Sequence, residues 1–151
     1  MAPPRSASGA PPQGGAAGGP AEPDPRRPLD PGLWTSNELR ALPPPSSWPA
    51  DCACASLRCP GWESIGAPLE APAFRRLGTL RDPALDEPTV EEVPGSRFWA
   101  VDAPIAPAWF PYNRSEVWAC AACGRGFLQY TEYGGYYVDH RVRQIDPALV
   151  T

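Results

Sequence analysis

The five cysteines of this chain are the residues whose type and spacing best suit chemistry. Cys120 and Cys123 have Cys-x-x-Cys spacing, which lets one tight turn direct two thiolates at one ion, and Gly124 follows where such a turn needs a positive φ. Structural zinc takes four tetrahedral ligands, so we expect this pair to form half of a structural zinc site. The other half must come from a second cluster, and the spacing leaves open which two of its three members take part: Cys52, Cys54 and Cys59.

Residues 118–126 read Trp-Ala-Cys-Ala-Ala-Cys-Gly-Arg-Gly, which resembles the Cys-x-x-Cys-Gly knuckle of zinc-ribbon and rubredoxin-like proteins. The resemblance covers residues 116–140 and implies a metal-ligating turn. The chain departs from ordinary ribbons because 60 residues separate Cys59 from Cys120, against roughly 15–20 between ribbon knuckles. Iron is the alternative metal, since thiolates suit both ions, but a single rubredoxin-type iron calls for a second Cys-x-x-Cys-Gly turn, which is missing.

Composition divides the chain into a tail and a folded part. Residues 1–31 are mostly Pro, Gly, Ala and Ser, and they cannot bury enough apolar surface to offset the entropy of ordering. We therefore expect a disordered tail over 1–31 and a single metal-stabilised domain over 32–151. The 23 prolines interrupt helices and strands. The expected fold is small α+β, β-rich and irregular, with few short helices and a metal cross-link in support.

Local sequence signals predict two secondary-structure elements. Thr35 and Glu38 have capping-box spacing at the start of a short helix, which Pro43 and the prolines after it end. Residues 127–133 and 136–144 predict two strands joined by a two-residue turn, Gly134-Gly135.

That hairpin register places one set of facing residues in the core. The pairs are Tyr133 with Tyr136, Thr131 with Val138 and Phe127 with Val142. His140, opposite Gln129, is expected to be a polar histidine of the core or its rim. A competing interpretation exists, because apolar residues also recur at helical spacing over 138–149, so that this segment is strand or helix.

Charge and targeting signals suggest a location. All 13 basic residues are Arg, the net charge is −4, and Ala, Gly and Pro are in excess, which is typical of a GC-rich bacterium. The first residues, Met-Ala-Pro-Pro-Arg-Ser, lack an apolar stretch, and no segment has membrane-spanning length. We expect a cytoplasmic protein with no membrane partner, in a compartment where cysteines stay reduced.

The residues expected of an enzyme are missing. There is one histidine, His140, no Ser-His-Asp order is suggested, and no phosphate-binding glycine loop occurs outside the tail. Four thiolates around zinc also leave no position for water. We expect no enzymatic activity, no catalytic residue and no small-molecule substrate.

The leading functional hypothesis is a non-enzymatic zinc-stabilised protein-binding module, such as an accessory subunit or an immunity-like partner. Aromatic residues and Arg are the usual interface anchors, and the expected interaction surface comprises Tyr130, Tyr137, Arg141 and Trp62. The alternative is a zinc-ribbon nucleic-acid-binding protein that stacks bases on the tyrosines beside Arg125, Arg141 and Arg143, although an acidic chain disfavours it. A redox or iron-binding rubredoxin-like protein is the second alternative.

Overall fold

The computed structural model describes residues 32–151, so the tail predicted over 1–31 lies outside the described residues. Every helix and strand belongs to one unit, which comprises residues 32–81 and 88–151 of the described chain. Residues 82–87 belong to a second unit and contain a turn in which the Leu85 amide donates to the carbonyl of Asp82 (3.1 Å). The single domain expected over 32–151 stays a prediction.

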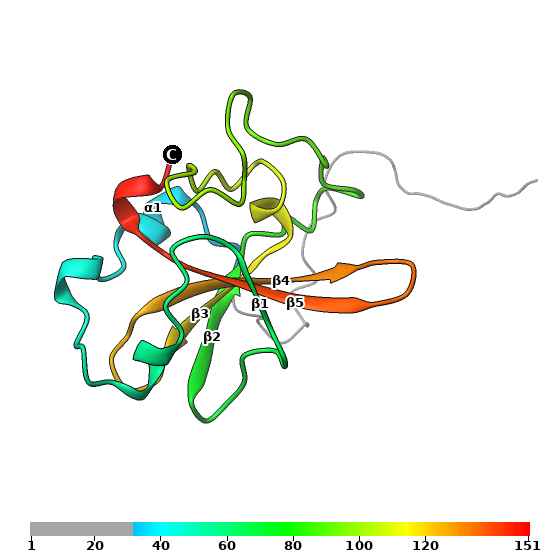
Figure 1. Cartoon of the computed structure of the whole chain (residues 1–151). Helices are drawn as coiled ribbons and strands as arrows, with labels where there is room; N and C mark the ends of the chain where they lie inside the picture. Colours follow the sequence, from blue (N-terminus) through cyan, green and yellow to red (C-terminus); the bar gives the residue numbers. More distant parts are fainter. Residues whose placement is uncertain (1–31) are drawn as a thin grey trace, which may run out of the picture. The chain divides into compact units, whose positions relative to one another are not determined.

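A five-stranded antiparallel sheet is the framework, with the strand order β1-β5-β4-β3-β2 (Figure 1). The central three strands follow one another along the chain and form a meander, whereas β1 and β2 take opposite edges. The connection between β1 and β2 must therefore cross one face of the sheet. The strands are β1 Glu63–Ile65, β2 Phe74–Thr79, β3 Glu116–Cys120, β4 Gly126–Tyr133 and β5 Val138–Gln144.

The helices are few and short, as predicted. The only α-helix of the described chain, α1 Ser36–Arg40, has the expected capping box, in which the Thr35 side chain accepts from the backbone and Glu38 reaches back to the Thr35 amide. Ser36 also donates to the carbonyl of Thr151 (2.7 Å), so α1 lies against the C-terminal residues. Four 3-10 turns complete the list: η1 Pro45–Ser47, η2 Ala53–Ser56, η3 Tyr112–Arg114 and η4 Pro147–Leu149.

The predicted C-terminal hairpin exists, but its register differs from the expected one. Tyr133 pairs with Val138, Thr131 with His140 and Phe127 with Gln144, a shift of two residues. The loop is therefore 134–137. Neither Gly134 nor Gly135 has the positive φ that a two-residue turn favours. The helical alternative for 138–149 is wrong, since β5 runs to Gln144 and only the short turn η4 follows.

Apolar side chains are buried on both faces of the sheet. One cluster contains Val117 of β3 and Leu128 of β4, and the other contains Phe127, the neighbour of Leu128 on β4, and Val142 of β5. The expected core face of the hairpin is thus buried only at its inner end. Tyr133, Tyr136 and Val138 are exposed, since β3 pairs with β4 only at 126–129 and β1 with β5 only at 140–142. The hairpin extends past its neighbours there (Figure 1).

Arg143 is a fully buried cation on β5. Its guanidinium donates to the carbonyls of Pro60 (2.9 Å) and Ala103 (2.9 Å), to that of Val101 (3.2 Å), and to the hydroxyl of Tyr112. One side chain thereby attaches two irregular segments to the sheet. Burial raises the pKa of Tyr112, while the charge of Arg143 acts against that rise.

Replacing Arg143 by Met should lower the free energy of unfolding by about 3 kcal/mol, because three loop carbonyls and the buried hydroxyl of Tyr112 lose their donor. Arg141→Met is the control, since the Arg141 side chain is partly exposed and ion-paired with Asp139, an interaction worth less than about 1 kcal/mol. Urea unfolding of both variants measures the difference. Equal losses would contradict the organising role of Arg143.

Candidate metal centre

Four cysteines converge at one point beside the sheet. The Sγ atoms of Cys52, Cys54, Cys120 and Cys123 all lie within 4.8 Å of one another, and all four thiols are free. Two contacts join the segments crosswise, Cys52 to Cys120 at 3.6 Å and Cys54 to Cys123 at 3.4 Å. Each segment therefore contributes two sulfur atoms to a site that can hold a metal ion.

The first pair is presented by a 3-10 turn. Cys52 is the N-cap of η2 and Cys54 lies within it. The carbonyls of both residues accept turn hydrogen bonds, from the amides of Ala55 and Leu57 respectively, each at 2.9 Å. The tight turn holds the two side chains of a Cys-x-Cys pair on the same side.

The second pair is presented by the turn that follows β3, where the sequence resembles a zinc-ribbon knuckle. Cys120 ends β3, its amide donates to the carbonyl of Arg125 (2.9 Å), and its carbonyl accepts from Gly124 (2.9 Å). Gly124 has φ +83°, as predicted, a conformation in which a side chain would be strained. The Ala121 amide donates to the carbonyl of Ala73 (2.9 Å), so the turn that precedes β2 also holds this segment in place.

Backbone amides favour the thiolate of Cys120. Burial raises the pKa of this thiol, but hydrogen bonds from the amides of Cys123 and Ala122 and from the thiols of Cys54 and Cys52 together lower it to about 7. Burial raises the pKa of Cys123, although an amide hydrogen bond from Arg125 acts against that rise. Burial raises the pKa of Cys54, and neighbouring thiols add to the effect. Amide donors favour the thiolate, which is the form that binds metal. Cys120 therefore forms the metal-binding thiolate more readily than Cys54 or Cys123.

The sulfur geometry fits a four-coordinate soft cation. Zn–S bonds of about 2.3 Å in a tetrahedron separate the sulfurs by about 3.8 Å, close to the 3.4 and 3.6 Å contacts observed. Cys52 and Cys123 are half-buried, and a cavity of about 440 Å³ adjoins the cluster. The wall of this cavity includes three of the four cysteines, Cys52, Cys54 and Cys120.

Cys59, the third candidate of its cluster, is not brought to the site. It is fully buried, and its thiol donates to the carbonyl of Leu57 (3.6 Å). Its backbone pairs with Gln144, whose amide donates to the Cys59 carbonyl (2.8 Å). Burial raises the pKa of its thiol to about 12. Cys59 therefore anchors its loop to the end of β5, and no spacing rule in the sequence distinguishes it from Cys52 or Cys54.

The expected interaction surface is largely internal. Tyr130 is 4% exposed, and half-buried Trp62 packs on its ring and on that of Tyr112. Arg141 is paired with Asp139 and Glu132. Of the four residues, Tyr137 alone is exposed.

Two of the three arginines expected beside the tyrosines are also buried. Arg125 is 3% exposed and Arg143 is fully buried. The sequence patterns missed the exposed end of the hairpin, because its apolar residues were assigned to the core. The signal that could have found it is the concentration of aromatic residues around the Gly134-Gly135 turn.

None of the helices in the described range is long and apolar enough to cross a membrane. Comparison of the chain with protein-family models, with curated proteins and with solved structures found no match.

Single Cys→Ser replacements test the assignment of the site. Serine at any of the four clustered positions should reduce bound metal well below one ion per chain, because the hydroxyl is a poor ligand for a soft ion. Cys59→Ser makes the same chemical change outside the cluster and should retain one ion. Elemental analysis of the purified variants measures both. Metal loss with Cys59→Ser, or retention with Cys54→Ser, would contradict the assignment.

Proposed function

We propose that the four cysteines hold one structural zinc ion and that the chain is a non-enzymatic protein-binding module built on that ion. The observation that carries the proposal is the gathering of four thiol sulfurs within 4.8 Å from two distant segments. A tetrahedral thiolate set fills every position of zinc, so the ion has none left for water or substrate. The zinc then serves as a cross-link that fixes the strands and loops around it.

The unequal halves of the site favour zinc over iron. A knuckle with amide-to-sulfur hydrogen bonds supplies Cys120 and Cys123, whereas a 3-10 turn supplies Cys52 and Cys54. Rubredoxin-like iron sites use two matching knuckles, and this chain has one. Zinc has no geometric preference from its d electrons, so two differently shaped turns can supply its ligands.

Metal analysis and chelation test this part of the proposal. The purified chain should contain one zinc per molecule and be colourless. Removing the ion should abolish cooperative unfolding, because structural zinc sites contribute about 10–16 kcal/mol of apparent binding free energy. Thermal unfolding followed by circular dichroism, with and without a strong chelator, measures this. A coloured iron protein, or a chelator-treated chain with unchanged unfolding, would contradict it.

The surface that best supports a binding role is the projecting end of the hairpin. Tyr133, Tyr136, Tyr137 and Val138 form this surface, which we call the hairpin tip, and each side chain is more than half exposed. Tyrosine gives a large contact area at low conformational cost, and clustered exposed apolar groups mark interaction sites. Tyr137 also supports the loop itself, because its ring packs against Gly134.

A paired comparison tests the binding role of the hairpin tip. The double variant Tyr133→Ser, Tyr136→Ser should lose a partner that the wild-type chain captures from its native host, because the aromatic contact area is removed. Trp99→Ser removes an exposed aromatic outside the hairpin and should leave capture unchanged. Quantitative mass spectrometry of the captured proteins measures the ratio. A partner retained by the tip variant, or none specific to the wild type, would overturn this role.

A further inference from the structure

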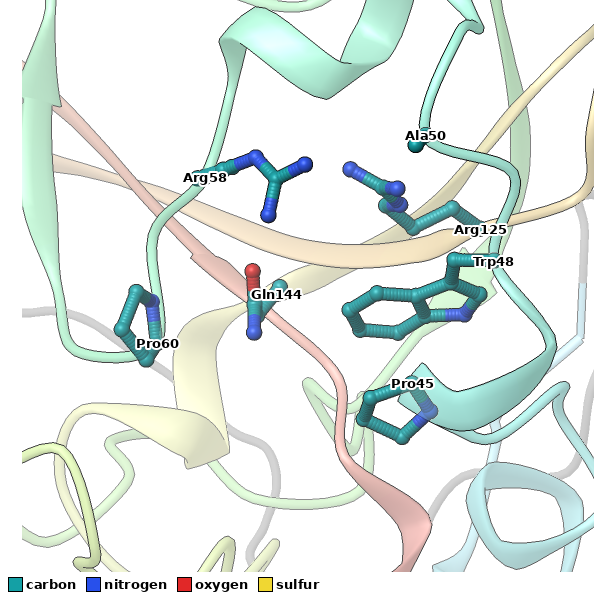
Figure 2. Close-up of a pocket in the computed structure, with 7 residues that line it drawn as sticks. All are labelled: Pro45, Trp48, Ala50, Arg58, Pro60, Arg125 and Gln144. Carbon is teal, nitrogen blue, oxygen red and sulfur yellow. The ribbon is translucent and has the colours of Figure 1, made fainter.

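A second cavity lies apart from the four cysteines, and its volume of about 460 Å³ is within the range of small-molecule sites. Segments far apart in the sequence form its wall: the region around η1, the loop after η2, the knuckle and the end of β5. Figure 2 shows its lining residues, which are Pro45, Trp48, Ala50, Arg58, Pro60, Arg125 and Gln144.

Two cations face one another across this cavity. The guanidinium groups of Arg58 and Arg125 point toward each other in Figure 2, and no carboxylate is among the lining residues. Within residues 32–151, neither group forms an ion pair. The chain as a whole has a net charge of −4, so this is a local concentration of positive charge in an acidic protein. Like charges held together without a counterion create a site for an anion.

The Arg125 side chain is held in place by its surroundings, but part of its hydrogen-bonding capacity is unused. It is 3% exposed, and its guanidinium lies 4.6 Å from the centre of the Trp48 ring. It donates long hydrogen bonds to the carbonyls of Cys54 (3.5 Å) and Pro49 (3.4 Å), and its buried Nε has no partner. Buried donors almost always have an acceptor, so the guanidinium of Arg125, which lines the cavity, retains unused donor capacity.

Gln144 adds a further donor to the wall. Its Oε1 accepts from the amide of Cys59 (3.2 Å), which fixes the orientation of the side-chain amide and leaves the NH₂ group as a donor. Trp48, Pro45 and Pro60 supply the apolar part of the wall. The cavity therefore combines many N–H donors and two positive charges with room for an organic group.

We propose that this cavity binds a phosphate monoester, with the phosphate group between Arg58 and Arg125 and the organic group against Trp48. Phosphate carries about −1.5 to −2 charges at pH 7 and three acceptor oxygens, which matches the charges and donors of the two guanidinium groups. A carboxylate offers one charge and two oxygens and would leave donors unpaired. Guanidinium groups are also the side chains best shaped for bidentate phosphate recognition.

Two probes that share a phenyl ring test the ligand class on the full chain in phosphate-free buffer. Isothermal titration calorimetry should show saturable binding of phenyl phosphate and at least tenfold weaker binding of benzoate. The indole resonance of Trp48 should shift with phenyl phosphate in the nitrogen–proton correlation spectrum. Benzoate binding as tight as phenyl phosphate, or absence of saturable phenyl phosphate binding, would overturn the proposal.

A matched pair of variants locates the site. Arg58→Gln should weaken phenyl phosphate binding at least tenfold, and because Arg58 is exposed the fold should persist. Arg75→Gln changes the net charge equally at an exposed position on β2 that does not line the cavity, and should change the affinity less than twofold. Equal weakening by both variants would mean that phenyl phosphate is attracted to the positive charges of the protein surface in general, and it would overturn the assignment of the site to this cavity.

Discussion

The meeting of residues 52–54 with residues 120–123 is the contact on which the rest of the structure depends. The thiols that meet are 68 and 69 residues apart in the sequence. Between them lie both edge strands, β1 and β2, and the connection that carries buried Leu69 across the sheet. Closing so long a loop costs chain entropy, and the short strands offer little to offset it. The metal cross-link that we propose between the two cysteine segments would hold the edge strands against the central meander.

Proline content explains why the interior uses arginine so heavily. Each proline contributes a carbonyl acceptor and no N–H donor, so loops rich in proline have surplus acceptors. Guanidinium groups balance them: Arg143 donates to three loop carbonyls, and Arg114 donates to the carbonyls of Pro88 and Thr89. The indoles of Trp34 and Trp48 act in the same way, toward Leu77 and Pro43. Side-chain donors thus replace part of the missing backbone pairing.

Local signals in the sequence predicted local structure. The capping box at Thr35, the positive φ of Gly124, the hairpin and the pairing of Cys120 with Cys123 each depend on residues within a few positions of one another. Features that depend on contacts between residues far apart in the sequence could not be predicted from local patterns. Cys59 is excluded because Gln144 binds its backbone, and Tyr130 is buried because Trp62 and Phe110 pack on its ring. The hairpin register depends on the conformation of two glycines, which permit more than one turn.

The burial of Cys59 has a consequence for the order of events in folding. In the unfolded chain, Cys59 is as free to bind an ion as Cys54, and it is only five positions away. Metals bind cysteines of unfolded chains, so an early ion samples chelates that include Cys59. If the four-cysteine set that we propose holds the ion, that set is selected only when β5 forms and Gln144 binds the Cys59 backbone. Refolding with metal present would then include a ligand exchange, in which Cys59 leaves the ion as its backbone pairs with the end of β5.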